Sequence, residues 1–552
     1  MTNTLLTLFS LERYQHYHRA GFWRDDTIYA LVRAHAQRTP DKIAVRTRHA
    51  VFSYRQLLEA ADNFAADLAA RGLQPGQRVA VWLPGRIETV VTLVACSRNA
   101  YVCCPSLHRD HTVGEIIELL KRMRAAAVVA ETGYGADADR KDFFSLAAEV
   151  ETLRHIYRLD KSGAVTHHGI VPPVAGPLPE PAPNDPNRVL YLAFTSGTTG
   201  LPKGVMHSDN TLLANARVLA SDWSITDSSV VYSMSPLSHN LGFGATIMAL
   251  CVGGEIVIHD LPRGASLVDR LIETDTSFLV GVPTHAIDLL NEVKARNLSG
   301  IGRLKGFRIS GASAPREVVA DLLKYGIVPQ SGYGMTETCS HQYTLPDDDP
   351  KLIVESCGRS CAGYEIRIFA RDNPDQELPP GEIGQIGGRG ASLMLGYFDD
   401  QTATETSFNK AGWFMTGDLG WVDENGYLRI TGRKKDVIIR GGHNIYPAKI
   451  EALALRHPAI HRAVAVPVAD ARLGEKVCLA VMFHPGKSTS AADILAYLDR
   501  QGLSKYDMPE YFIAVDDIPL TASGKIRKRD IAEQIAAGQL QPAPIRWQAK
   551  AG

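Results

Sequence analysis

Short apolar segments alternate with helical patterns along residues 27–180, and this alternation constrains the fold more than any other feature of the chain. A helical pattern stopped by Pro40 is followed by an apolar strand, and a second helical pattern ends at Gly72. Residues 77–85 then have the composition of a buried strand that ends in Pro-Gly. Strands that alternate with helices form mainly parallel sheets covered by helices. The sequence therefore predicts an α/β fold.

The length of the chain predicts more than one domain. Its 552 residues exceed what a single hydrophobic core organises. The pattern changes after residue 430, where a basic junction precedes two apolar strands, a helix and a basic tail. We therefore predict a large N-terminal domain at 1–433, a junction at 434–436 and a smaller C-terminal domain at 437–552.

Charge and cysteine usage exclude several classes of protein. Lys plus Arg number 59 against 60 for Asp plus Glu, so nothing in the net charge of −1 favours a nucleic-acid or anionic-membrane partner. The eight cysteines lack paired CxxC spacing, and Cys357 and Cys361 have no second ligand pair nearby for zinc. The N-terminus has no basic leader, and no apolar run reaches the ~18 residues that span a bilayer. We expect a cytoplasmic protein without a membrane span.

Residues 191–210 run from an apolar strand into a loop rich in Gly, Ser and Thr that is followed by Lys203. Backbone N–H groups and hydroxyls of such a loop can converge on phosphate oxygens, but the loop does not match the Walker A pattern. Taken alone, it fits a flexible turn equally well. Two further strands, at 306–315 and 328–338, also end in small residues, and ligands of open α/β sheets bind outside such strand ends.

The loop matches the [Ser/Thr]-Ser-Gly-Thr-Thr-Gly-x-Pro-Lys-Gly signature, and the chain resembles the adenylate-forming superfamily. That superfamily includes acyl- and aryl-CoA synthetases, the adenylation domains of peptide synthetases and firefly-type luciferases. Further motifs of the superfamily follow in the expected order, at 333–338, 412–420, 427–451 and 519–531. The resemblance spans roughly residues 27–535. It implies a large adenylation domain of helix-covered sheets with a small barrel-like subdomain, and a small mobile α+β C-terminal domain.

The resemblance implies an acid–thiol ligase that works in two steps. ATP and a carboxylate first give an acyl-adenylate and pyrophosphate, and a thiol, usually that of coenzyme A, then displaces AMP. The first step brings a carboxylate onto an anionic triphosphate, so cations and N–H donors must offset the repulsion. The implied ligands are ATP, Mg²⁺, coenzyme A and a small carboxylic acid, and the implied assembly is a monomer or homodimer.

The same resemblance assigns the nucleotide site. Thr336 would bond the α-phosphate, Glu337 would hold Mg²⁺, and Lys525 would reach the reacting carboxylate and the α-phosphate. Asp418 and Arg433 would hold the ribose. The other implied residues grip the β- and γ-phosphates or surround adenine: Thr195, Ser196, Gly197, Thr198, Thr199, Gly200, Lys203, Gly311, Ala312, Tyr333, Gly334 and Met335. Taken singly, each polar residue could equally be a solvated loop residue, and Lys525 a surface lysine in a basic run.

The acid and the thiol are less closely specified. The implied acid pocket contains His239, Asn240, Gly244, Val282, Gly311 and Gly332. His239 either gates the approach of the carboxylate, as a catalytic residue, or packs at a strand end. Few charged residues occur in these stretches, so we expect an acid with a single carboxylate. Residues 19–32, 345–350 and 470–481 also resemble short/medium-chain acyl-CoA and alicyclic (cyclohexanecarboxylate-type) CoA ligases, which implies a cyclic, aromatic or medium-chain monocarboxylate. Lys435 would belong to the hinge, and Gly441 and Gly442 would let the pantetheine arm pass close to the backbone.

Two other functions stay open at this point. A stand-alone aryl-acid adenylation enzyme would load the phosphopantetheine of a carrier protein. Asn240 and Lys435 are similar to the residues that such enzymes have at the matching positions. A non-catalytic nucleotide-binding module is the second alternative. The presence of all the implied polar residues argues against it: Thr336, Glu337, Asp418 and Lys525.

Overall fold

The computed structural model describes residues 10–161, 169–174, 176–195, 202–311, 315–441, 443–520 and 526–547. The chain divides into two compact units, and each is described by itself. The larger unit comprises 1–366 and 388–414, and the smaller comprises 367–387 and 415–552. The chain therefore leaves the larger unit within strand β16 (Tyr364–Phe369) and returns to it within β17 (Gly384–Gly390).

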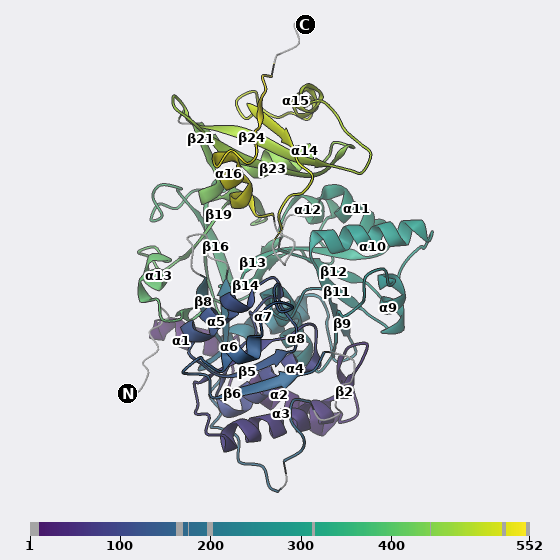
Figure 1. Cartoon of the computed structure of the whole chain (residues 1–552), viewed down its shortest axis with the longest axis vertical. Coiled ribbons are helices and arrows are strands. Elements are labelled where there is room, and N and C mark those ends of the chain that lie inside the picture. Colours follow the sequence, from purple (N-terminus) through teal and green to yellow (C-terminus); the bar gives the residue numbers. More distant parts are fainter. Residues whose placement is uncertain are drawn as a thin grey trace. The chain divides into compact units, whose positions relative to one another are not determined.

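A nine-stranded sheet forms one layer of the larger unit among the described residues (Figure 1). Its central strands pair in parallel, whereas antiparallel strands lie at both edges. In order across the sheet, the strands are β15 (Arg359–Ser360), β14 (Cys339–Tyr343), β13 (Val328–Met335), β12 (Gly306–Ile309), β11 (Phe278–Gly281), β9 (Val230–Ser233), β10 (Glu255–Ile258), β1 (Ile43–Arg46) and β2 (Val51–Ser53).

A seven-stranded sheet forms a second layer of this unit in the described part of the chain. Parallel pairing joins its strands except at β7 and β8, which form an antiparallel hairpin, and at β18, which pairs antiparallel with β8. In order, the strands are β18 (Gly396–Tyr397), β8 (Lys203–Ser208), β7 (Val189–Thr195), β4 (Val102–Cys104), β3 (Arg78–Trp82), β5 (Ala125–Glu131) and β6 (His155–Leu159).

Alternating side chains place helices on both faces of each sheet, since neighbouring residues of a strand point to opposite faces. Val79 and Val81 join the largest core, which also contains the inner strands of the other sheet, whereas Ala80 and Trp82 join a separate core. The helices of the largest core are α2 (Ile28–Arg38), α3 (Tyr54–Ala70), α4 (Ile87–Asn99), α7 (Asp209–Asp222) and α8 (Asn240–Val252). Those on the outer faces are α5 (Val113–Arg122), α6 (Phe143–Ala147), α9 (Leu267–Glu273), α10 (Pro283–Ala295) and α11 (Arg316–Lys324). The predicted α/β fold with parallel-rich, helix-covered sheets is confirmed.

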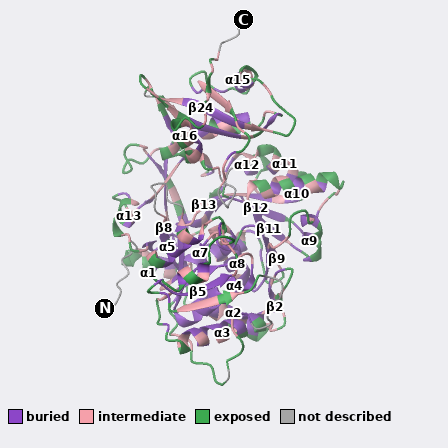
Figure 2. Ribbon diagram, viewed as in Figure 1, coloured by how far each residue is buried: buried purple, intermediate pink, exposed green. Residues whose placement is uncertain are grey.

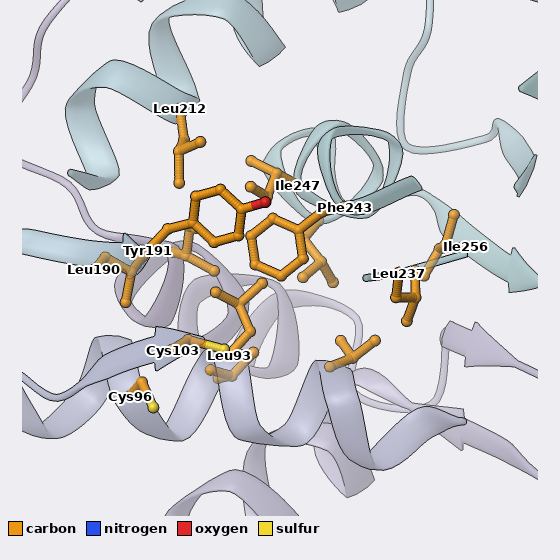
Figure 3. Close-up of a cluster of buried hydrophobic side chains, with 14 of the residues drawn as sticks. Leu93, Cys96, Cys103, Leu190, Tyr191, Leu212, Leu237, Phe243, Ile247 and Ile256 are labelled. Atoms are coloured by element: carbon orange, nitrogen blue, oxygen red, sulfur yellow. The ribbon is translucent and has the colours of Figure 1, made fainter. Parts of the chain in front are cut away.

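The interior of the largest core is closely packed. The rings of Tyr191 and Phe243 stack with their centroids 4.4 Å apart, and Figure 3 shows them among aliphatic side chains from both layers. Every residue of α4 is buried (Figure 2). Its one buried acidic and one buried basic side chain are paired, because Arg86 binds Glu88 and Arg98 binds Asp62. The predicted helix stops are confirmed, since α2 ends before Pro40 and α3 ends before Gly72, which has a φ of +85°.

The remaining helices of the larger unit lie at its periphery. Helices α1 and α13 are drawn beside one another at one side in Figure 1. The three peripheral helices are α1 (Leu11–Arg19), α12 (Pro350–Glu355) and α13 (Gln401–Thr406). None of the helices formed by the described residues combines the length and the apolar character that a bilayer-spanning segment needs.

The smaller unit holds two sheets among its described residues. One contains β16, β17, β19 (Phe414–Val422) and β20 (Leu428–Arg433). The strands of the other are β22 (His443–Ile445), β21 (Ile438–Arg440), β24 (Gly474–Phe483), β25 (Tyr511–Ala514), β26 (Ala543–Pro544) and β23 (Ile460–Asp470), which pairs with β24. Helices α14 (Pro447–Ala454) and α15 (Ala491–Arg500) cover one face of this sheet, and α16 (Lys528–Ala536) covers the other.

The predicted junction at 434–436 forms a short 3-10 turn, Lys434–Asp436, after Gly432, which has a φ of +148°. It lies between the two sheets of the smaller unit along the chain. That this turn is the hinge of a moving domain remains a prediction, as do the predicted domain bounds.

Candidate active site

The residues predicted to hold the α-phosphate and the metal lie at the tip of a hairpin. Strand β13 continues to Met335, so Tyr333 and Gly334 belong to the strand, whereas the sequence suggested that small residues here leave a strand for a loop. Met335 pairs with Cys339 of β14, and Thr336 to Thr338 form the turn between the strands. A Cβ at Gly334 would lie 2.1 Å from the Cys339 carbonyl oxygen, so the hairpin closes only with glycine there.

The backbone of this turn is held by neutral groups. The Nε2 atom of His207, on β8, lies 2.7 Å from the Thr336 carbonyl oxygen. Met394 N donates to Glu337 O at 2.7 Å, and Ser392 Oγ donates to Thr338 O at 3.0 Å. Burial lowers the pKa of His207 to about 4. At neutral pH the ring is therefore uncharged, and its Nε2 carries the hydrogen because a carbonyl oxygen can only accept.

The Glu337 side chain is buried and accepts a hydrogen bond from a tyrosine 60 positions further along the chain. Tyr397 Oη, on β18, donates to Glu337 Oε1 at 3.0 Å. Burial and the charge of Glu337 raise the pKa of Tyr397, so its hydroxyl remains a donor at neutral pH. The ammonium of Lys203 lies 4.7 Å from the centroid of the same ring, within cation–π range. Tyr397 thus joins the predicted phosphate-binding lysine to the predicted metal-binding carboxylate.

The strands that carry the opening motif flank its loop. Thr195, the last residue of β7, pairs with Lys203, the first residue of β8. Phe194 N is fixed by Ser106 Oγ at 2.6 Å. Five of the predicted phosphate-binding residues lie outside the described residues: Ser196, Gly197, Thr198, Thr199 and Gly200.

The predicted ribose residues are brought together in the smaller unit. Asp418 of β19 is directly opposite Arg433 of β20, and Arg433 Nε lies 3.2 Å from Asp418 Oδ1. Arg433 is the more exposed of the two, with 47% of its side chain accessible against 14% for Asp418, so the carboxylate is fixed and the guanidinium can still reach a ligand.

Of the glycines predicted to face the pantetheine arm, Gly441 has a φ of +56°. Ala312, Gly442 and Lys525 lie outside the described residues.

A cavity of about 30 Å³ lies between the nine-stranded sheet and the helices α7 and α8. Asn240 and Gly244 of the predicted acid pocket line it, as do Cys339 and Ser340, which directly follow the turn at 336–338. Its other lining residues are Leu212, Asn215, Ala216, Leu219, Leu241, Ala245, Ile247, Met248, Val280 and Arg308.

The other predicted acid-pocket residues lie outside this lining. A Cβ at Gly332 would be 3.6 Å from Arg308 Nη2, whereas Val282 precedes α10 and Gly311 has a φ of +92°. Open space faces Gly244, whereas a Cβ at Gly242 would lie 2.4 Å from Ser235 O. Gly242 therefore serves close backbone packing, and only Gly244 leaves volume to the cavity.

His239 precedes α8 and stacks on a second histidine. The rings of His108 and His239 are 4.1 Å apart and nearly parallel, and His108 Nδ1 lies 3.0 Å from Ser238 Oγ. Burial, with smaller contributions from His239 and His111, lowers the pKa of His108 to about 2. His108 is thus uncharged at neutral pH, and its ring covers one face of the His239 ring and limits the orientations of that side chain.

Sequence reasoning missed His207, Tyr397, His108 and Arg308. The first three act through contacts with residues distant in the sequence, so no local pattern identifies them. Arg308 did give a signal, because it is a charged residue within an apolar strand, where a partner or a function is required.

The fold and this arrangement are those expected of an adenylate-forming enzyme: the β7–β8 hairpin, which carries the opening motif, contacts the turn of the β13–β14 hairpin, and β14 lines a mostly apolar cavity. Residues 32–398 match the model of the AMP-binding enzyme family, and 449–525 match the AMP-binding enzyme C-terminal domain. The chain belongs to the AMP-binding enzyme family, and it is an acid–thiol ligase of the acyl- and aryl-CoA synthetase class.

Named relatives cover almost the whole chain. A medium-chain fatty-acid–CoA ligase of Escherichia coli K12 is 32% identical over 96% of this chain and 94% of its own length. A salicyl-AMP ligase/salicyl-S-ArCP synthetase of Mycobacterium tuberculosis is 30% identical over 96% of this chain and 94% of its own. The ATP-bound crystal structure of MatB from Rhodopseudomonas palustris is similar at a TM-score of 0.81 and 28% identity, covering 92% of this chain and 99% of that one.

Proposed function

We propose that this enzyme joins a cyclic, aromatic or medium-chain carboxylic acid to coenzyme A, with an acyl-adenylate as the intermediate. The observation that carries the proposal is the position of the buried Glu337. Its carboxylate accepts a hydrogen bond from Tyr397, whose ring contacts the Lys203 ammonium. The residues that follow its turn line the acid cavity. Nucleotide phosphates and acid would thereby meet at one turn. The apolar walls from α7 and α8 suit a hydrocarbon chain or ring.

The residues present fit a magnesium ion that the nucleotide helps to bind. No group of three or more potential ligands occurs among the described residues, and Glu337 supplies one hard carboxylate. Mg²⁺ is typically bound by one or two carboxylates together with substrate phosphates. Glu337 would hold the ion, which would neutralise phosphate charge as pyrophosphate leaves. Tyr397 orients the carboxylate by occupying one of its oxygens.

The chain's own groups then account for the first step. Thr336 would bond the α-phosphate from a turn fixed at three carbonyls, while Lys203 and the opening loop hold the β- and γ-phosphates. Lys525 would stabilise the charge that develops as the carboxylate attacks the α-phosphorus. Asp418, fixed by Arg433, would accept hydrogen bonds from the ribose. We place the reaction in the cytoplasm.

Acid-dependent exchange of labelled pyrophosphate into ATP tests the proposal. A panel of benzoic, alicyclic and C4–C10 acids is assayed with the wild type and with Glu337→Gln, and products formed with coenzyme A are identified by mass. We expect exchange with at least one acid, loss of exchange in Glu337→Gln, and a CoA thioester. Absence of exchange with every acid would refute the assignment.

The thiol of a carrier protein is the second candidate for the acyl acceptor, because one relative is named a salicyl-S-ArCP synthetase. Coenzyme A and a phosphopantetheinylated carrier protein are offered together to the preformed acyl-adenylate. Exclusive appearance of the acyl group on the carrier would replace the CoA-ligase proposal by this one.

A further inference from the structure

Arg308 lies in the middle of the nine-stranded sheet and points into the acid cavity. It pairs with Val280 of β11 and with Gln330 of β13, so strands cover it on both sides. Its neighbours Phe307 and Ile309 belong to the core on the opposite face, with α9, α10 and α11. Arg308 therefore faces α7 and α8 and lines the cavity, and only 3% of it is accessible.

This buried guanidinium has a donor without a partner. Nη1 donates to Gln330 Oε1 at 2.6 Å, whereas Nη2 is buried and has no hydrogen-bond partner among the described residues. The Tyr343 ring, 6.0 Å away, is its aromatic neighbour. Burial lowers the pKa of Arg308 to about 10, so the group is still charged at neutral pH.

Other buried arginines of the chain are paired with carboxylates. Arg86 binds Glu88 and Glu131, and Arg98 binds Asp62. In contrast, no carboxylate of the described residues lines the cavity that Arg308 faces. Burial of a charge destabilises a protein unless a partner is supplied, so the lack of one at a cavity wall indicates that a ligand supplies it.

The surroundings of Arg308 leave few other polar groups for a ligand. Asn215 and Ser340 satisfy one another, because Asn215 Nδ2 donates to Ser340 O at 2.8 Å and Ser340 N donates to Asn215 Oδ1 at 3.2 Å. The walls are otherwise mostly aliphatic. A volume of about 30 Å³ accommodates roughly two water-sized groups, which is the size of the two oxygens of a carboxylate.

We propose that Arg308 binds a second carboxylate of the acid substrate, which is therefore a dicarboxylic acid activated at one end only. This inference rests on the proposed function and names the substrate class of the same cavity. One carboxylate reacts with ATP at the catalytic turn, and the other accepts a charge-assisted hydrogen bond from Nη2. It departs from the expectation of a monocarboxylate, which relied on the scarcity of charged residues in the pocket stretches and overlooked Arg308.

The wild-type enzyme tests the proposal without any substitution. Each dicarboxylate from C4 to C10 is compared with its monomethyl ester and with the monocarboxylate of equal length, using acid-dependent pyrophosphate exchange. The ester has nearly the same shape but a single charge. We expect kcat/KM for the preferred dicarboxylate to exceed that of its ester by about 10²-fold to 10³-fold, as for loss of one partner of a buried charge pair.

Arg308→Met tests whether this preference arises at Arg308. We expect kcat/KM for the dicarboxylate to fall by about 10²-fold to 10³-fold and that for the monomethyl ester to hold or rise, so that the preference disappears or inverts. A structural role alone would lower both by the same factor. Arg308→Lys, which keeps the charge but not the planar fork, should retain a smaller preference.

Arg270→Met is the matched control. Arg270 is 6% accessible and pairs with Glu273 at 2.9 Å, and it is not part of the cavity lining. This variant should keep the wild-type preference. Equal use of dicarboxylates and esters by the wild type would overturn the proposal on Arg308 while leaving the ligase assignment intact. Exchange with no acid of either kind would overturn both. If Arg308→Met does not fold, the wild-type comparison and Arg308→Lys decide.

Discussion

Removing the hydroxyl of Tyr397 should weaken magnesium-dependent catalysis while leaving the fold in place. Tyr397 Oη donates to Glu337 Oε1 at 3.0 Å in a buried setting. A hydrogen bond to a charged group contributes about 1.5–3 kcal/mol, and every 1.4 kcal/mol is tenfold in an equilibrium constant. Tyr397→Phe should therefore raise the Mg²⁺ concentration needed for half-maximal pyrophosphate exchange by about 10- to 100-fold, as for other groups that orient a metal ligand.

The phenylalanine ring preserves the contact with Lys203, whose ammonium lies 4.7 Å from the ring centroid of Tyr397. The KM for ATP at saturating Mg²⁺ should accordingly change little in Tyr397→Phe. Tyr397→Leu removes the ring as well, so it should raise that KM further, by at least the few-fold that a cation–π contact of about 0.5–1 kcal/mol provides.

Tyr191→Phe is the control for loss of a buried hydroxyl. Tyr191 lies in the core shown in Figure 3, and its Oη has no hydrogen-bond partner among the described residues. Its substitution should leave the Mg²⁺ dependence unchanged. Identical Mg²⁺ titrations for the wild type and Tyr397→Phe would refute the argument that Tyr397 orients the metal-binding carboxylate.

Three further outcomes are expected. Lys525→Ala should lower adenylation by about 10²-fold to 10³-fold but spare thioester formation from premade acyl-adenylate, and an equal loss in both half-reactions, followed by product mass, would contradict its role. The pKa of His207 falls from 6.5 unfolded to about 4 folded, so the unfolded state binds more protons in this window. Stability should therefore be lost as pH falls from 6.5 to 4, by about 3 kcal/mol from this residue, and urea midpoints of His207→Gln should show a correspondingly weaker pH dependence. Gly334→Ala places a Cβ 2.1 Å from the Cys339 carbonyl oxygen and should cost at least about tenfold in activity and 1–3 kcal/mol in unfolding free energy, whereas Gly244→Ala, with no atom within 4 Å, should fold like the wild type in a thermal melt.

The fold was predictable because its signals are local. Apolar strands, helical spacing and stops such as Pro40 and Gly72 all act within a few residues, and each lies where the pattern placed it. The extent of β13 was not predictable in the same way. Its small residues resemble a loop, but pairing with β14 extends the strand to Met335.

The composition of the site was predictable only in part. Motif order marks Thr336 and Glu337, yet the residues that hold them come from elsewhere in the chain: His207 precedes Thr336 by 129 positions and Tyr397 follows Glu337 by 60. Such contacts depend on how sheets are assembled, and a single sequence carries no local record of them. Arg308 shows the opposite case, since a charge within an apolar strand was visible and its consequence followed only from the cavity beside it.

The distribution of charge at the turn has a mechanistic consequence. The groups that fix its three carbonyls are an uncharged imidazole, a backbone amide and a serine hydroxyl. Tyr397 contacts both charged side chains, because its hydroxyl donates to the Glu337 carboxylate and its ring lies 4.7 Å from the Lys203 ammonium. Neutral groups therefore position the backbone of the turn, and the charged side chains take no part in these three contacts. Neutral substitutions of His207 or Ser392 should therefore alter kcat by moving the turn. Substitutions of Glu337 or Lys203 should instead alter the dependence of the rate on Mg²⁺ and ATP.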